Sequence, residues 1–360
     1  MSQTLDAIHD VLASWVAPWL NRSLADIGAI AEVRLEGDIA SVSLQLGFPC
    51  ARHGQVLTDE LQRYLEQLPG VAEARVSITS QVQSGAVQGQ LQPLPGIGNV
   101  IAVASGKGGV GKSTVAANLA LALHAEGARV GVLDADIYGP SQPTLFNTVP
   151  TEPPRPGPEG KFQPHESLGI RCMSMGHLVE PGTAMIWRGP MVTQALHQLL
   201  YQTRWGELDY LIVDLPPGTG DVQLTLSQKI PVSGAVVITT PQELSLIDAR
   251  KAVHMFNKVE IRVLGIIENM SGFDCPACGE RTAIFGEGGG RRLADEAGVR
   301  LLGSIPLNAG IRAQADAGHP TVASAADSDL ANVYVNAALS MAAELSVAQR
   351  VVMPTIEMVD

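Results

Sequence analysis

The stretch Ser105–Thr114, with the sequence SGKGGVGKST, constrains the fold of this chain more than any other. An apolar segment, Val100–Ala104, precedes it, and Val115–Glu126 follows with apolar residues at helical spacing. A strand, a glycine-rich turn and a helix are the context of a phosphate-binding loop, and the stretch satisfies the pattern G-x-x-x-x-G-K-[ST]. An ordinary glycine-rich turn is the alternative, but it needs neither the lysine nor the serine. The expected phosphate-binding residues are Gly106, Lys107, Gly108, Gly109, Val110, Gly111, Lys112, Ser113 and Thr114.

The chemistry of this loop follows from its residue types. Glycines let the backbone curl so that successive N–H groups point at one anion, and the helix that starts there adds its positive end. We expect the ammonium group of Lys112 to reach the β- and γ-phosphates of a nucleotide, and the hydroxyl of Ser113 to ligate Mg²⁺. The sequence therefore predicts a nucleoside triphosphate site at the start of this helix.

Composition sets the scale of the fold and limits its partners. The chain has 360 residues, of which 46% are apolar and only 4% aromatic. This suits about two domains, with cores of aliphatic side chains as in buried parallel sheets. The formal charge of −12 disfavours non-specific nucleic-acid binding and attachment to a lipid surface, because both require a basic face. No apolar run approaches the roughly 20 residues of a membrane span.

The termini and the cysteines indicate a compartment. Met1–Asp10 lacks the basic and apolar regions of a signal peptide, and four cysteines in 360 residues do not make a disulfide framework. We therefore expect the protein in the reducing cytosol. The tail Val351–Asp360 contains no cationic residue, so we expect no basic membrane anchor there.

Residues 1–80 are expected to form a small α+β domain, and residues 81–98, rich in Gln, Gly, Ser and Pro, are typical of a linker. Cys50 lies in the small domain, where a lone cysteine is more often a small buried hydrophobe than a ligand. Apolar spacing predicts, in chain order, a helix at Leu5–Leu12, strands at Val33–Leu35 and Val42–Leu46, a helix at Val56–Leu68 and a strand at Ala74–Ile78.

Residues 99–345 alternate strands with helices, which predicts an α/β domain: a P-loop NTPase parallel sheet with helices on both faces. Residues 148–161 are dense in Pro and Gly and are expected to form a surface loop. Residues 327–344 are expected to be helical, and 346–360 to form a tail. The predicted strands are Val100–Ala104, Val130–Leu133, Tyr210–Val213, Ala235–Thr239 and Val263–Ile267.

Acidic residues follow two of the predicted strands. Asp134 and Asp136 come after the second strand and Asp214 after the third, at the sheet edge where ligands bind in such folds. One acid there can hold Mg²⁺ or its waters and another can orient an attacking water. Helix capping or turn chemistry is the alternative for Asp134 and Asp136. Gly218 follows Asp214 and is placed for its N–H to sense a γ-phosphate, so that hydrolysis would release the loop.

Two further features carry possible chemistry. Lys107 is either a solvated charge or a cation that acts on its own or a partner's nucleotide, much as an arginine finger does.

Cys275 and Cys278 form a C-P-A-C-G segment, and thiolates at this spacing can share one metal centre, which usually needs four ligands. Cys50 and Cys172 stand far off in sequence, so a two-fold dimer would complete the site from two such pairs. A structural zinc and a redox dithiol are the competing interpretations.

Several motifs together resemble a known family. Gly106–Thr114 resembles the deviant Walker A loop of the MinD/ParA/nitrogenase iron-protein class. With Asp134–Ser141, Trp187–Met191, Asp214–Asp221 and the cysteine pair, residues 92–345 resemble the Mrp/ApbC iron–sulfur cluster carrier ATPases. The N-terminal domain is similar to one often fused to these carriers and found in iron–sulfur assembly factors. Its usual acidic segment is replaced by Ala17-Pro18-Trp19-Leu20.

The resemblance implies an ATP-binding homodimer with slow ATPase activity. It implies that the dimer holds a [4Fe–4S] cluster at Cys275 and Cys278, accepts it from a scaffold protein and passes it to apo-proteins. By position, Lys107 would cross the dimer interface and Asp136 would polarise water. Asp214 would belong to the coordination shell of Mg²⁺, and Asn269 would recognise adenine. The sequence lacks the guanine-specific Asn-Lys-x-Asp motif, which is consistent with ATP as the nucleotide. The alternative is a positioning ATPase of the MinD/ParA type, with a structural zinc or no metal.

Overall fold

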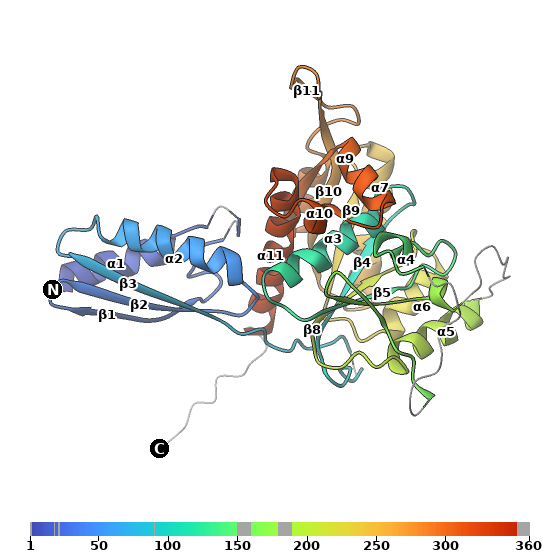
Figure 1. Cartoon of the computed structure of the whole chain (residues 1–360), viewed down its shortest axis with the longest axis horizontal. Coiled ribbons are helices and arrows are strands. Elements are labelled where there is room, and N and C mark those ends of the chain that lie inside the picture. Colours follow the sequence, from blue (N-terminus) through green and yellow to red (C-terminus); the bar gives the residue numbers. More distant parts are fainter. Residues whose placement is uncertain are drawn as a thin grey trace. The chain divides into compact units, whose positions relative to one another are not determined.

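A computed structural model of the chain describes residues 2–17, 19–20, 22–89, 91–149, 160–178 and 189–350 (Figure 1). The described residues form two compact units. One contains the residues up to Gly85, Ala125–Gly127 and the end of the last helix from Leu339, and the other contains the residues between. Within the described ranges, no helix is both long and apolar enough to cross a lipid bilayer.

The first unit is built on a three-stranded sheet, and its elements confirm the predicted helices and strands. β2 lies in the centre, antiparallel to β1 and parallel to β3. The second helix buries Gly54, Leu57, Leu61 and Leu65, a spacing of three and four residues that gives one apolar face. The elements are α1 (Ser2–Ser14), β1 (Ile30–Glu36), β2 (Ile39–Leu46), α2 (Ala51–Leu65) and β3 (Glu73–Ser80).

The second unit is an α/β fold around one large sheet, as predicted. The strand order is β11-β10-β9-β4-β8-β5-β7-β6, with β12 paired to β10. Neighbours pair in parallel except at β10–β11 and β6–β7. Its strands are β4 (Ile97–Ser105), β5 (Val130–Asp134), β6 (His165–Ser167), β7 (Ile170–Ser174), β8 (Leu208–Asp214), β9 (Gly234–Thr239), β10 (Val263–Asp274), β11 (Arg281–Thr282) and β12 (Arg300–Leu307).

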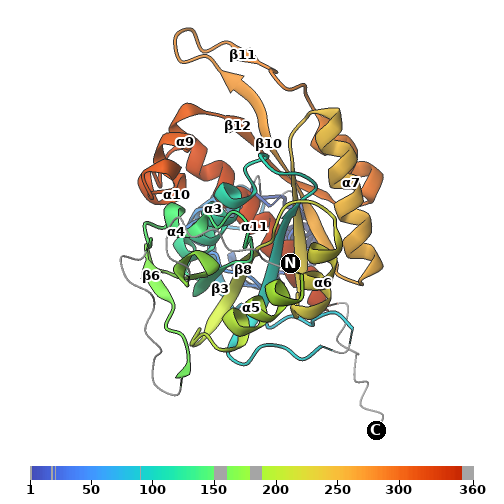
Figure 2. The ribbon, with the colours of Figure 1, turned by 90° about the vertical axis from the view of Figure 1, so that its right-hand side faces the viewer.

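Helices cover both faces of this sheet (Figures 1 and 2). One face packs apolar residues of α5, α6, α7 and α8 against alternate residues of the central strand, Val100, Ala102 and Ala104, while α3 and the first part of α11 lie on the other face. Both faces of the sheet are therefore shielded from solvent by helices, which explains why its strands are continuously apolar. The helical segments are α3 (Lys112–Ala125), α4 (Gln142–Leu145), η2 (Met175–His177), α5 (Gly189–Tyr201), α6 (Asp221–Lys229), α7 (Glu243–Lys258), α8 (Gly289–Ala297), α9 (Ala309–Asp316), α10 (Thr321–Ser324) and α11 (Asp329–Arg350).

This topology places the phosphate loop at a switch point of the sheet. β4 lies between β8 and β9, and the chain next enters β5, on the far side of β8. In open α/β sheets ligands bind beyond the carboxyl ends of the strands at such a point. The ends of β4, β5 and β8 therefore converge on one crevice.

Some predicted features differ from the structure or fall outside the described residues. The sequence-based prediction did not include β6, β7, β11 and β12. Three of them, β6, β7 and β11, have five residues or fewer, which is too short to show a clear periodicity. The last helix runs to Arg350, beyond the predicted end at Glu344. The features outside the described residues are Pro18, most of the 148–161 loop, Trp187, Arg188 and the tail Val351–Asp360.

Candidate functional site

The phosphate loop has the backbone that its glycines predict. Gly109 and Gly111 both have φ of +82°, a conformation that residues with a Cβ rarely adopt. At Gly111 a Cβ would also lie 2.2 Å from Nδ2 of Asn269, so a side chain there would require Asn269 to move. Lys112 begins α3 directly after the loop, and the N–H groups of its first turn face the space where an anion would sit.

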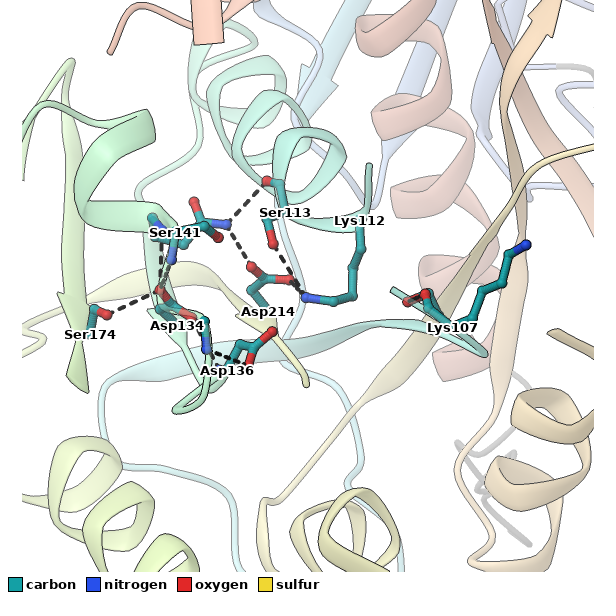
Figure 3. A network of polar contacts seen from close by, with 11 residues as sticks. Lys107, Lys112, Ser113, Asp134, Asp136, Ser141, Ser174 and Asp214 are labelled. Carbon is teal, nitrogen blue, oxygen red and sulfur yellow. Dashed lines mark hydrogen bonds and ion pairs between the residues drawn. The ribbon is translucent and has the colours of Figure 1, made fainter. Parts of the chain in front are cut away.

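Lys112 and Asp214 form a buried ion pair across this crevice (Figure 3). Their side chains are 6% and 0% exposed, so the pair is shielded from water. The ammonium of Lys112 also lies 3.3 Å from Oγ of Ser113. The lysine, the hydroxyl and the carboxylate that the sequence assigned to phosphate and Mg²⁺ are therefore brought together.

Asp134 lies beside this pair and is fully buried. Its carboxylate accepts hydrogen bonds from the N–H groups of Asp136, Ser141 and Gln142 at 2.9–3.1 Å, and from Oγ of Ser174 at 3.0 Å (Figure 3). Burial, followed by the charge of Asp214, raises the pKa of Asp134 to about 7. These contacts match the alternative role of Asp134 in turn formation, because its carboxylate fixes both ends of the loop from Asp136 to Ser141.

Asp136 lies on that loop and is half-buried. Burial raises the pKa of its carboxyl group, while Lys112 lowers it by a smaller amount. Gly139 donates its N–H to Oδ1 of Asp136 at 3.2 Å. The carboxylate borders a cavity of about 550 Å³ that Tyr138 and Pro217 also line, so it has room beside it for a water molecule.

Two other residues assigned to the nucleotide, Lys107 and Gly218, do not face the space beside Lys112 and Asp214 in the same way as the carboxylates. The side chain of Lys107 is half-exposed and points away from Lys112 and Asp214 (Figure 3). The N–H of Gly218 donates to the carbonyl of Ser105 at 2.9 Å. A γ-phosphate that recruits this N–H would therefore have to replace a bond between the two loops.

Asn269 contacts the phosphate loop itself. Its Nδ2 donates to the carbonyl of Val110 at 2.8 Å, and its Oδ1 accepts the N–H of Met270 at 3.0 Å. The side chain is 8% exposed. The structure thus places Asn269 against the loop, and a role in reading adenine remains a prediction.

Cys275 and Cys278 lie on the hairpin loop between β10 and β11. Main-chain bonds close the loop, from Cys275 N–H to Glu280 O at 3.0 Å and from Gly279 N–H to Cys275 O at 2.8 Å. The pKa of the Cys275 thiol is lowered, first by the N–H of Ala277 and then by the N–H and side chain of Cys278. This arrangement favours the thiolate, which is the form that binds metal.

The two cysteines of this loop would form half of a four-ligand metal site. In the part of the chain that the structure describes, no three His, Cys, Asp or Glu side chains gather closely enough to hold an ion. Cys50 and Cys172 are buried, and burial raises the pKa of both thiols. They behave as the small buried hydrophobes that a lone cysteine predicts.

The nucleotide site and the cysteine loop share one strand. β10 runs through Asn269, next to the phosphate loop, and ends at Asp274, one residue before Cys275. Six residues span at most about 20 Å when fully extended, and Met270 within this stretch has φ of +58°, so the path is shorter than that. The hairpin extends away from the sheet in both views (Figures 1 and 2). The cysteine loop is therefore remote from the phosphate loop, and β10 is the element that joins them.

The residues present fit a nucleotide with Mg²⁺. A Cβ built at Gly109 or Gly218 meets no heavy atom within 4 Å, so open space lies beside the loops expected to hold phosphate. A hydroxyl and a carboxylate, from Ser113 and Asp214, are the oxygen ligands that Mg²⁺ prefers. The crevice therefore has the shape and the donors for such a ligand.

Two contacts of the site were not predicted. Ser174 lies at the end of β7, a strand that the sequence reading missed, so its approach to Asp134 had no signal. Gln142 is fully buried and donates to Asp214 at 2.8 Å. This contact could not be predicted, because a glutamine eight residues after Asp134 belongs to no recognised sequence motif.

The sequence matches two family models. Residues 96–342 match the NUBPL iron-transfer P-loop NTPase model, and residues 5–78 match an iron–sulfur cluster assembly protein. The chain belongs to the NUBPL iron-transfer P-loop NTPase family. This confirms the resemblance drawn from the motifs, including that of the N-terminal domain, and with it the reading of the chain as a P-loop NTPase.

Named relatives of the family agree. An iron–sulfur cluster carrier protein of Pseudomonas fragi is 52% identical over 280 residues, covering 78% of this chain and 98% of that protein. One of Salmonella typhimurium is 45% identical over 339 residues, covering 94% and 91%. The iron–sulfur cluster transfer protein NUBPL of Mus musculus is 49% identical over 269 residues, covering 74% and 83%. A cluster carrier role is therefore supported.

Solved structures support the fold. A nucleotide-binding protein from Archaeoglobus fulgidus, solved in complex with ADP, is 42% identical, with a TM-score of 0.55 over 62% of this chain and 87% of that one. The cell division ATPase MinD of Pyrococcus furiosus is 21% identical, with a TM-score of 0.50 over 67% of this chain and 97% of its own. The second likeness concerns the fold alone.

Proposed function

We propose that this protein binds and hydrolyses ATP and carries a [4Fe–4S] cluster between two copies of the chain. The observation that carries the proposal is the half-site at Cys275 and Cys278. Its two thiols lie on an exposed loop, one has a lowered pKa, and the described residues of one chain supply no further ligands. Since a tetrahedral centre usually needs four ligands, a second copy related by a two-fold axis supplies the other two.

The nucleotide half of the proposal rests on residues that already converge. Lys112 exchanges its bond to Asp214 for the β- and γ-phosphates, and Ser113 and Asp214 then hold the Mg²⁺ shell. When bound, Mg²⁺ neutralises phosphate charge. Asp136 orients the attacking water from the cavity beside it. Lys107, which points away from its own site, reaches the phosphates of the second copy.

An exposed apolar group next to the phosphate loop favours a second copy as the partner. Leu244 and Ile247 lie three residues apart in the first turns of α7 and are 73% and 39% exposed. The backbone of Asp248, one residue on, lies against the phosphate loop, where it would meet a Cβ at Gly106. Apolar side chains exposed beside a nucleotide site suit a face that closes on an identical copy when the nucleotide is bound.

The shared strand β10 offers a path from the nucleotide to the cluster. Asn269 on this strand holds the carbonyl of Val110 in the phosphate loop. A change in the loop on ATP binding therefore shifts the strand that leads into the loop of Cys275. In this proposal the nucleotide state sets how firmly the thiols of the two copies hold their cargo, which apo-proteins receive and scaffold proteins supply. The thiolates need a reducing compartment, so we place the protein in the cytoplasm.

Anaerobic reconstitution with iron and sulfide tests the proposal. The wild type is expected to gain an iron–sulfur chromophore, with about four irons per dimer, and to elute as a dimer. The double variant Cys275→Ala/Cys278→Ala is expected to lose the chromophore and to keep nucleotide binding. The double variant Cys50→Ala/Cys172→Ala is the matched control, because it removes two buried thiols and is expected to retain the cluster.

Other outcomes would contradict the proposal. Retention of the cluster by the Cys275/Cys278 variant would falsify the ligand assignment. A wild type that binds one zinc per pair of chains and no iron would support the alternative of a positioning ATPase with a structural metal. A monomer that holds the full cluster would remove the need for a second copy.

A further inference from the structure

Gln142 connects three segments of the nucleotide site. It is the first residue of α4 and is fully buried. Its main-chain N–H donates to Oδ2 of Asp134 at 3.1 Å. Its side-chain Nε2 donates to Oδ2 of Asp214 at 2.8 Å and to the carbonyl of Ser113 at 3.1 Å. One residue thus contacts the ends of β5 and β8 and the start of α3.

The orientation of this amide is fixed by its partners. A carboxylate and a carbonyl both accept hydrogen bonds, so only the NH₂ group can face Asp214 and Ser113. The amide oxygen Oε1 is buried, and no partner for it occurs among the described residues. Since an unpartnered buried acceptor is unfavourable, this glutamine is not the side chain that stability alone would favour at this position.

Asp214 is shared between Gln142 and Lys112. Lys112 holds Oδ1 and Gln142 holds Oδ2. When the ammonium of Lys112 turns to a phosphate, the bond from Gln142 remains and keeps the carboxylate in place. The same residue is anchored by its backbone to Asp134, which accepts the N–H groups at both ends of the loop, those of Asp136 and Ser141.

We propose that Gln142 is a positioning residue that couples the metal side of the nucleotide site to the Asp136 loop. Through Nε2 it fixes Asp214 against Ser113, and through its N–H it fixes the start of α4 against Asp134. Occupation of the site by nucleotide with Mg²⁺ is therefore transmitted to the loop that carries Asp136. The inference rests on the proposed ATP binding, and it adds a residue that no motif identifies.

The test replaces the amide without changing the length of the side chain. Gln142→Met removes the donor and keeps an unbranched chain, and Gln142→Glu turns the donor into an acceptor facing two acceptors. Binding of a fluorescent ATP analogue is measured with EDTA and with Mg²⁺. Gln142→Met is expected to leave the affinity in EDTA within about twofold and to reduce the gain from Mg²⁺ by about tenfold, and Gln142→Glu to reduce it further. Hydrogen exchange of residues 134–142 is expected to slow with Mg²⁺ and nucleotide in the wild type only.

Gln88→Met is the matched control. The amide of Gln88 also bridges main-chain groups, at Ser227, Ile230 and Val232, and its contacts do not include the acidic groups of the site. It is expected to lower stability and to keep both the Mg²⁺ gain and the exchange protection. If Gln142→Met retains the wild-type gain and protection, or if Gln88→Met loses them equally, the inference is overturned. If the wild type binds no nucleotide, the proposed function fails first, and that result is distinct from either of these.

Discussion

Asp134 and Asp214 lie directly opposite each other on the neighbouring strands β5 and β8. Both are fully buried, and Lys112 is the cation that neutralises one of them. Burial, followed by the charge of Asp214 on the facing strand, raises the pKa of Asp134, because both disfavour a second ionised carboxylate beside the same lysine. The two carboxylates therefore make the stability of the nucleotide-free protein depend on pH.

The first prediction concerns stability and pH. The pKa of Asp134 is raised from 3.8 to about 7 by burial and by Asp214. Between these values the folded protein binds more protons than the unfolded chain, so this contribution to stability is full at low pH and is lost as pH rises. Its slope is at most about 1.4 kcal/mol per pH unit. Relative to Asp134→Asn, the wild type is expected to lose stability between about pH 4 and 7.

Urea unfolding of the nucleotide-free protein at several pH values measures this difference. Comparison with Asp134→Asn is needed because other carboxyl groups act in the opposite sense, such as Asp209, whose pKa is lowered by the hydrogen bonds and charge of Arg129. A stability difference that stays constant over the range would show that Asp134 does not take up the proton.

The second prediction concerns the ion pair of Lys112 and Asp214. Lys112→Met leaves two buried carboxylates without a cation, and removal of one partner of such a pair typically costs about 3–5 kcal/mol. The double variant Lys112→Met/Asp214→Asn is expected to recover most of this loss, because both charges are gone. Neither variant is expected to hydrolyse ATP, and both are expected to retain a reconstituted cluster. Unfolding curves, phosphate release and the chromophore check the three parts.

A variant of Lys112 that lost the cluster together with hydrolysis would show that the loop mainly holds the fold. If the double variant were less stable than Lys112→Met, the two charges would not act as a pair in the folded protein.

The third prediction places Lys107 in the site of the second copy. Lys107→Ala and Asp136→Ala are each expected to abolish hydrolysis. In a mixed dimer, one site then carries both lesions and the other carries none. Random mixing makes about half of the dimers mixed, with one of two sites intact, so about a quarter of wild-type activity is expected to return. If Lys107 acted on the nucleotide of its own chain, the mixed dimers would recover no ATPase activity. A sample of Lys107→Ala taken alone through the same mixing procedure is the control.

Much of the fold was predictable because its strands are buried on both faces. The segments around Val100–Ala104 and Ala235–Thr239 are continuous apolar runs, and parallel sheets leave that pattern in the sequence. The phosphate loop was predictable for another reason. Its glycines and its lysine meet local backbone and charge requirements, which no distant residue can relax.

The remaining contacts of the site depend on tertiary structure. Ser174 reaches Asp134 only because β7 pairs with β5, and a five-residue strand has too little periodicity to reveal this. Gln142 was invisible because glutamine is usually exposed, whereas here its amide lies between Asp214 and Ser113. The half-site at Cys275 was visible in sequence, but its completion involves a second chain.

The last prediction compares two glycines of the phosphate loop. Gly109 and Gly111 share a φ of +82°, so an alanine at either position costs roughly 1 kcal/mol from backbone strain. At Gly109 a Cβ meets nothing within 4 Å, while at Gly111 it lies 2.2 Å from Nδ2 of Asn269. Gly111→Ala must therefore also displace Asn269 from Val110, with an added loss of about 1–3 kcal/mol.

Thermal or urea unfolding ranks the two variants, and nucleotide binding gives an independent readout. Gly111→Ala is expected to be the less stable and to bind nucleotide more weakly than Gly109→Ala. The double variant Gly111→Ala/Asn269→Ala separates the two causes, because it removes the clash and leaves the strain, so part of the stability should return. Equal losses at the two glycines would mean that strain alone decides, and that the contact between Asn269 and the loop is not rigid.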